Sequence, residues 1–268
     1  MIAFLRRFRY KLITNRKVRQ YILYAFGEII LVMIGILLAV QVNDWSTLRK
    51  EQKEEQQLLR QLKTEFEVNR MQIEDKITLH GQIVNSGKQV LRLVDGQDRT
   101  LSLDSLYSHL GWTITAPTFD PSLGVTNDLI NSGKLYLIRN DSLRHLVSGW
   151  SGYIDFATEE EKIWLKIRDE FYIPYLKESF SYRNVLHAIQ QEGHARAIMN
   201  FGGKYELSNA GRSKLANAEF REFTEVELMA LEDQIAELTN LNDLSVTQMT
   251  VLRDMADQIL GLIEEDIN

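Results

Sequence analysis

The chain has 268 residues, with 31 Lys and Arg, 37 Asp and Glu, three prolines and no cysteine. The lack of cysteine excludes a disulfide framework, thiol catalysis and cysteine-based metal or iron–sulfur sites. Charge is spread unevenly, because residues 1–42 contain seven basic side chains and one acidic one, whereas the other 226 residues contain 24 basic and 36 acidic side chains. A basic head on an acidic body argues against a nucleic-acid-binding body and indicates a head that faces a membrane.

The segment from Tyr21 to Val42 is apolar enough to cross a membrane. A helix of its length spans about 33 Å, against roughly 30 Å of hydrocarbon. Thirteen of its residues are Leu, Ile, Val or Phe, and at about −0.3 to −0.6 kcal/mol each they favour insertion by roughly 4–8 kcal/mol. The single charge, Glu28, opposes insertion by at most about 2.5–3.5 kcal/mol. We therefore predict a basic tail over residues 1–20, a transmembrane helix over 21–42 and an extramembrane domain over 43–268.

The span predicts an uncleaved signal anchor rather than a signal peptide. It is longer than the usual core of a signal peptide, and no A-x-A-like cleavage site follows it. Seven basic residues precede the span, whereas residues 43–62 contain four basic residues balanced by four acids. This difference places the N-terminus in the cytoplasm and the body in the periplasm. No second apolar run of this length follows, so the chain crosses once, which excludes single-chain transporters and channels.

The basic tail has two interpretations. Met1, Leu5, Phe8 and Leu12 recur at helical spacing, so the tail could lie on the inner leaflet as an amphipathic helix. A disordered basic tail explains the same composition equally well.

One face of the predicted span carries an acid and two small residues. Glu28, Val32, Gly35 and Ala39 recur at steps of three and four residues. A small-x-x-x-small pair lets another helix approach closely, and an acid within a membrane usually points away from lipid. We expect this face to pack against a helix of a second copy or of a partner membrane protein. The alternative is that Glu28 reaches the cytoplasmic surface by itself and that Gly35 has no special role.

Two stretches of the chain carry a resemblance to a known family. They are Tyr24, Gly27-Glu28, Gly35-Ile36, Ala39 and Asn43-Asp44-Trp45, followed by Phe119-Asp120-Pro121, residues 128–135, Ile138, Asn140 and Leu143-Arg144. Together they resemble the signature of a large family of uncharacterised bacterial single-pass membrane proteins, classed as a domain of unknown function. The resemblance implies an inner-membrane anchor and a helical body outside the cytoplasm. It implies no activity and no functional residue.

The body is predicted to be helical, because it is rich in Glu, Lys, Gln and Leu and nearly free of proline. A first long helix runs from Trp45 to about Val94, continuous with the span, and Gly81 and Gly87 are places where it could kink or break. Further helices are predicted from Ser102 to Leu110, from Thr126 to Ser132 with Gly133 as its cap, and from Asn140 or Asp141 to Ile173 before Pro174, with a restart at Thr158. Residues 111–125 are predicted to form a loop, and residues 174–211 are not assigned.

The C-terminal part is predicted to be an antiparallel helical hairpin. One helix is expected from Lys214 to Thr239, and Ser245-x-x-Gln248 reads as a capping box that starts the last helix. Packing this hairpin on the two earlier long helices gives an all-α fold: an N-terminal transmembrane helix that continues into an extramembrane bundle of about four long helices with a loop-rich insert.

The sequence contains no recognisable catalytic or cofactor motif. Asn-Ser-Gly-Lys occurs at residues 85–88 and 131–134, but neither copy has the glycine spacing or the following Ser or Thr of a phosphate-binding loop. His187 and His194 are too far apart for chelation on one helix. The run Glu159–Glu161 is expected to be a solvated face or the start of a helix. We therefore predict no catalytic residue, no cofactor, no metal and no nucleic-acid partner.

Aromatic residues concentrate in the middle third of the chain. They are Trp112, Phe119, Trp150, Tyr153, Phe156, Trp164, Phe171, Tyr172 and Tyr175. They could line a binding groove, but packing of the core explains the enrichment better.

Taken as a whole, the sequence favours a non-enzymatic, membrane-anchored helical binding or scaffold protein at the outer face of the inner membrane. Two alternatives remain open. One is a ligand-binding sensor body that reports through a partner, and the other is a periplasmic hydrolase of envelope polymers whose carboxylates the sequence does not identify.

Overall fold

The computed structural model describes residues 18–96, 100–191 and 211–267. The chain divides into two compact units, the first ending at Gln57 and the second beginning at Leu58.

Helices make up nearly all of the described secondary structure, which confirms the all-α prediction. In chain order the α-helices are α2 (Val18–Val94), α3 (Leu103–Thr113), α4 (Gly124–Asn131), α5 (Asp141–Ala157), α6 (Glu159–Ile167), α7 (Ile173–Ser179), α8 (Tyr182–Gln191) and α10 (Glu225–Asp266). A 3₁₀ turn, η1 (Lys134–Leu137), follows α4, and a π-helical turn, η2 (Arg168–Tyr172), joins α6 to α7. The sequence did not predict two short strands, β1 (Thr100–Ser102) and β2 (Phe220–Glu222), which pair antiparallel.

Helix α2 continues without interruption from the apolar segment into the amphipathic one, as predicted. Gly81 and Gly87, where a kink or break was considered, lie inside this continuous helix. The helix ends at Val94, directly before Asp95 and Gly96, as the sequence indicated.

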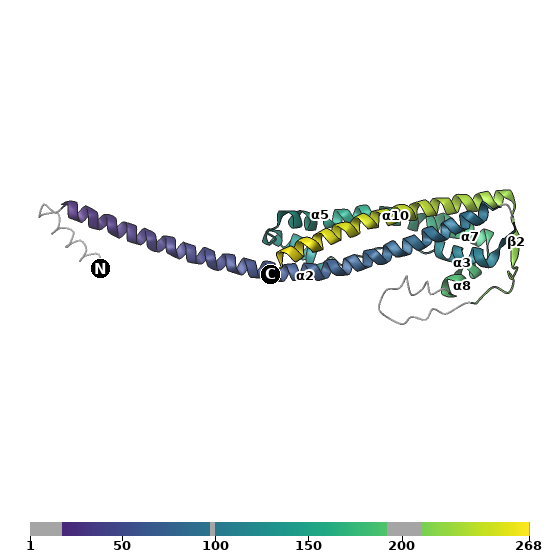
Figure 1. Ribbon diagram of the computed structural model, residues 1–268, viewed down its shortest axis with the longest axis horizontal. Helices are drawn as coiled ribbons and strands as arrows, with labels where there is room; N and C mark the ends of the chain where they lie inside the picture. Colours follow the sequence, from purple (N-terminus) through teal and green to yellow (C-terminus); the bar gives the residue numbers. More distant parts are fainter. Residues whose placement is uncertain (1–17, 97–99, 192–210, 268) are drawn as a thin grey trace. The chain divides into compact units, whose positions relative to one another are not determined.

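In the second unit, α2 and α10 lie side by side in opposite directions (Figure 1). The Lys63 Nζ lies 2.8 Å from Glu264 Oε1, and further along α2 the Lys88 Nζ lies 4.0 Å from Asp243 Oδ1. Gly87 lies at a point of close approach, because a Cβ built on it would be 2.1 Å from the Thr239 Oγ1. This glycine is therefore needed for packing.

The predicted C-terminal hairpin is wrong, because α10 is a single continuous helix. Ser245 does not cap a new helix; its hydroxyl donates to the Leu241 carbonyl four residues earlier, 3.0 Å away. Asn242, in the segment expected to form the loop, is fully buried and donates its side-chain amide to the Leu238 carbonyl. Polar residues that favour turns when exposed are accommodated here inside a helix, because their hydrogen bonds are satisfied locally.

The start of the last helix also differs from the prediction. Residues from Lys214 onward were expected to be helical, but α10 begins at Glu225. Thr224 and Glu227 form a capping box there, each side chain accepting a hydrogen bond from the other residue's backbone N–H. Phe223, within the range expected to be helical, is a buried residue that precedes the helix.

The helix predicted from Asn140 or Asp141 to Ile173 is divided into segments. Asn140 caps α5 as predicted, and its side chain accepts from the backbone N–H of Ser142 and Leu143. The chain restarts at Thr158 as proposed, but no side-chain capping bond forms there. The helix was predicted to end before Pro174, yet α7 contains this proline near its first residue, where a missing N–H is tolerated.

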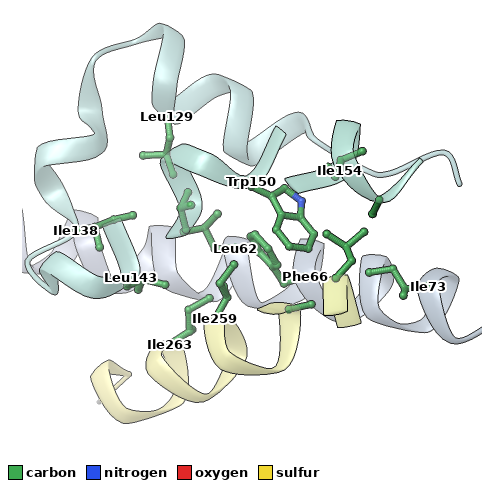
Figure 2. Packing of buried hydrophobic residues seen from close by; sticks show 14 of the residues in the cluster. Leu62, Phe66, Ile73, Leu129, Ile138, Leu143, Trp150, Ile154, Ile259 and Ile263 are labelled. Atoms are coloured by element: carbon green, nitrogen blue, oxygen red, sulfur yellow. The ribbon is translucent and has the colours of Figure 1, made fainter. Parts of the chain in front are cut away.

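Two clusters of buried apolar side chains form the core of the second unit. In the first, Phe66 of α2 and Trp150 of α5 lie with their ring centres 4.9 Å apart, and Figure 2 shows Leu62, Ile259 and Ile263 in the same cluster. The second cluster surrounds Trp164 and Tyr172, which are both buried. The core interpretation of the aromatic enrichment is thus confirmed for a subset: Phe119, Trp150, Trp164 and Tyr172.

Candidate functional site

The four residues of the predicted packing face lie on α2 in the first unit. Glu28, Val32, Gly35 and Ala39 are all exposed, and their spacing places them within about 60° of one another around the helix axis. A Cβ built on Gly35 would meet no atom within 4 Å. The face is therefore open, and its small residues leave a shallow stripe.

The surroundings of this face are apolar. Among the described residues, α2 is the one helix long and apolar enough to cross a membrane, and its most apolar stretch is not buried against any other part of the structure. The predicted tail over residues 1–20 lies largely outside the described residues, which begin at residue 18.

A second candidate site is a set of buried polar side chains that we name the polar clamp. It comprises Glu65, Asn69, His80, Glu161 and Asn242, none of them more than 5% exposed. Polar groups are seldom buried unless they are hydrogen-bonded, and these residues come from three helices far apart in the sequence.

Glu65 binds the first turn of α4. Its carboxylate accepts hydrogen bonds from the backbone N–H of Val125, at 2.6 Å, and of Thr126, at 3.0 Å. The Thr126 hydroxyl donates a third bond at 2.6 Å. A carboxylate at this place satisfies N–H groups that have no partner within the helix and complements the helix dipole.

Asn69 lies one turn further along α2 and holds the loop before α4. Its amide donates to the Ser122 carbonyl at 2.8 Å and accepts from the Ser122 N–H at 2.7 Å. The side chain therefore pairs with Ser122 as the backbone of a neighbouring strand would.

The remaining three clamp residues connect α10, α2 and α6. His80 Nδ1 lies 2.7 Å from Asn242 Oδ1, and His80 Nε2 lies 3.3 Å from Glu161 Oε1. An amide oxygen only accepts, so Nδ1 is the donor in the first contact. His80 Nε2 and Glu161 Oε1 can then form a hydrogen bond only if one of these two atoms carries a proton. The other oxygen of Glu161 accepts the Phe119 N–H at 3.1 Å, which brings the loop into the network.

A further pair of buried contacts holds the end of α3. The Tyr172 hydroxyl, from η2, lies 2.6 Å from the Thr113 Oγ1, and the Trp164 indole donates to the Thr115 carbonyl at 3.1 Å. Burial raises the pKa of Tyr172 well above the usual range, so its hydroxyl stays protonated. Because the Thr113 hydroxyl donates to the Leu110 carbonyl, Tyr172 is the donor to Thr113.

The sequence missed most of the clamp. The run Glu159–Glu161 starts α6, as one of the two expectations had it, and Glu159 is exposed. A solvated face is wrong for Glu161, because only 3% of it is exposed. His80 was not among the candidate residues predicted from the sequence, and His194 lies outside the described residues. The helical spacing could have indicated that Glu65 and Asn69 are buried, because they fall on the same side of α2 as the apolar Leu62 and Phe66.

The residues of the second family-like stretch have structural roles. Phe119, Leu129, Ile138 and Leu143 are buried in the first cluster. Arg144 donates to the Ile138 carbonyl at 2.9 Å, Asn140 caps α5, and Gly133 adopts a left-handed φ of 69° after α4. These residues explain how the loop and the α4 turn fold onto α2, and none of them points to catalysis.

Comparison with known proteins finds one similar family. A family of unknown function, DUF6090, matches residues 28–154. No curated protein and no solved structure matches the chain. The matched region contains the packing face, Glu65, Asn69 and His80, and ends before Glu161 and Asn242. Over these residues the chain is similar to a family of unknown function, as the two sequence stretches predicted.

Proposed function

We propose that the chain is a single-pass protein of the bacterial inner membrane, with a cytoplasmic N-terminus and a periplasmic helical body that serves as a non-enzymatic binding or scaffold protein. The observation that carries the proposal is the apolar part of α2, whose large side chains are exposed throughout. Exposed apolar surface of this extent is unfavourable in water and favourable in a bilayer. The excess of basic residues before the span supports the orientation.

The polar clamp supports a structural body rather than an active site. Its carboxylates are buried, and their oxygens already accept hydrogen bonds from Thr126, Val125 and Phe119. A catalytic carboxylate must reach its substrate, and Glu65 and Glu161 contact the protein's own backbone instead.

Location and orientation are tested together in a bacterial host. We expect the full-length chain to resist alkaline extraction from membranes. Alkaline phosphatase fused after Asn268 should be active, and green fluorescent protein fused there should be dark. Release by alkali, or a fluorescent C-terminal fusion, would contradict the proposal.

The packing face is proposed to bind a helix of a second copy or of a partner membrane protein. Glu28→Gln and Gly35→Leu should each lower the recovery of crosslinked complexes by about 5- to 30-fold, because contacts of this kind contribute about 1–2 kcal/mol in membranes. Gly27→Leu is the matched control, since Gly27 lies about 100° away from Glu28 around the helix.

The measurement is crosslinking in intact cells, followed by purification of the complexes and mass spectrometry. If Gly27→Leu reduces recovery as much as Gly35→Leu, the face is not specific. If neither Glu28→Gln nor Gly35→Leu lowers the recovery of crosslinked complexes, the proposed contact does not exist.

A further inference from the structure

Directly after the apolar segment, α2 carries an exposed tryptophan that contacts an arginine. Trp45 is 61% exposed, and the guanidinium carbon of Arg49 lies 5.0 Å from the centre of its ring. Residues four apart are neighbours on a helix, and helical side chains tilt toward the N-terminus. Arg49 is therefore directed back toward the apolar segment.

Basic and acidic side chains lie on different sides of α2 over residues 44–55. With about 100° per residue, Arg49 and Lys53 lie within about 80° of Trp45. Measured from Arg49, the acids of the same segment lie about 120–160° away around the helix axis: Asp44, Glu51, Glu54 and Glu55. Within the described part of the chain, neither Arg49 nor Lys53 is paired with a carboxylate. The side that bears Trp45 is thus cationic and open to an anion.

We propose that Trp45 and Arg49 bind the phosphate of an anionic phospholipid headgroup. The proposal rests on the proposed function, because it requires α2 to cross a bilayer whose hydrocarbon ends near Val42. Trp45 then lies about 4.5 Å beyond that boundary, and the Arg49 guanidinium is held at the same level by the ring. The headgroup layer on each side of a bilayer is roughly 5–8 Å thick, so both groups lie within it.

Both side chains suit this ligand. Tryptophan prefers the membrane interface, where its ring contacts acyl chains and its N–H meets water or headgroups. The planar guanidinium of Arg49 can donate two parallel hydrogen bonds to one phosphate, and stacking on Trp45 leaves its edge free to do so. Lys53, further from the boundary, adds attraction for a negative headgroup without reaching its phosphate.

The test uses the full-length protein in vesicles of phosphatidylcholine and phosphatidylglycerol in equal amounts. After mild detergent extraction, mass spectrometry counts each lipid retained per protein. We expect the wild-type protein to retain phosphatidylglycerol preferentially, and Arg49→Gln to lower that retention by about five-fold, the effect typical of one basic residue near an anionic surface. Arg49→Lys keeps the charge but loses the planar fork, so it should retain an intermediate amount.

Arg60→Gln is the matched control. Arg60 lies on the same side of α2 as Arg49, but about 27 Å beyond Val42, outside the headgroup layer. Its substitution should leave lipid retention unchanged. Equal loss in Arg49→Gln and Arg60→Gln, or no loss in Arg49→Gln, would overturn the lipid site even if the protein stays integrated in the membrane. Failure of the wild-type protein to resist alkaline extraction would instead overturn the proposed function.

Discussion

Replacing Glu161 by alanine is expected to destabilise the second unit by about 2–6 kcal/mol, because it leaves two buried polar groups without hydrogen-bond partners at a cost of about 1–3 kcal/mol each. The substitution leaves His80 Nε2 without its hydrogen-bond partner and the Phe119 N–H without an acceptor, in a site closed to water. A buried polar group without a partner loses the full free energy of its hydration. The loop that contains Phe119 should open with the loss of this bond.

Glu161→Gln separates hydrogen bonding from charge. A glutamine oxygen can still accept from the Phe119 N–H, and its amide can donate to His80 Nε2, which supplies the hydrogen that this contact requires. We therefore expect Glu161→Gln to lower the free energy of unfolding by no more than about 1 kcal/mol.

Both variants are compared as full-length proteins in detergent, with unfolding in urea followed by tryptophan fluorescence. Trp150 and Trp164 are buried in the two clusters and report on the second unit. Hydrogen exchange at Phe119 gives the local readout, which should rise in Glu161→Ala and stay low in Glu161→Gln. Equal losses in the two variants would show that the charge of Glu161, rather than its hydrogen bonds, stabilises the clamp.

Alanine substitutions at two glycines of α2 should have opposite effects. Gly87→Ala places a methyl group 2.1 Å from the Thr239 Oγ1, and overpacking of this kind costs about 1–3 kcal/mol, offset by about 1 kcal/mol of better helix propensity. We expect a net loss of up to about 2 kcal/mol. At Gly81 an added Cβ meets nothing within 4 Å, so Gly81→Ala should stabilise the protein by up to about 1 kcal/mol.

The clash at Gly87 can be relieved from the other helix. The Thr239 Oγ1 is buried without a hydrogen-bond partner among the described residues, so Thr239→Ala removes the clashing atom without breaking a bond. The double variant should recover most of the stability lost in Gly87→Ala, giving a positive coupling in a double-mutant cycle. If Gly87→Ala is as stabilising as Gly81→Ala, the two helices are not in close contact at this point.

Local signals in the sequence predicted the elements whose ends are set locally. The Asn140 cap, the end of α2 before Gly96 and the left-handed Gly133 depend on neighbouring residues, and each is found where it was expected. The continuity of α2 followed from its apolar and then amphipathic pattern. The C-terminal hairpin failed because the same polar residues serve as turn formers when exposed and as buried hydrogen-bonding groups inside a helix.

The polar clamp could not be predicted because its partners are joined only by the fold. His80 and Asn242 are 162 positions apart, and His80 and Glu161 are 81 apart. A carboxylate in an acidic run gives no local sign that it will be buried. The packing face on α2 is the opposite case: its spacing is local and visible, whereas the helix expected to cover it belongs to another molecule.

The π-helical turn η2 accommodates one extra residue without turning the following helix away from the core. Its Ile173 N–H bonds to the Arg168 carbonyl five residues back, so the turn holds one residue more than an α-helical turn would. Five residues of a π turn and four residues of an α-helix cover nearly the same rotation, so deleting one residue here with a return to α-helical bonding would leave α7 nearly in phase. Leu176, now fully buried, would still face the core. Related proteins should therefore differ in length by a single residue within residues 168–172 while the packing of α7 is kept.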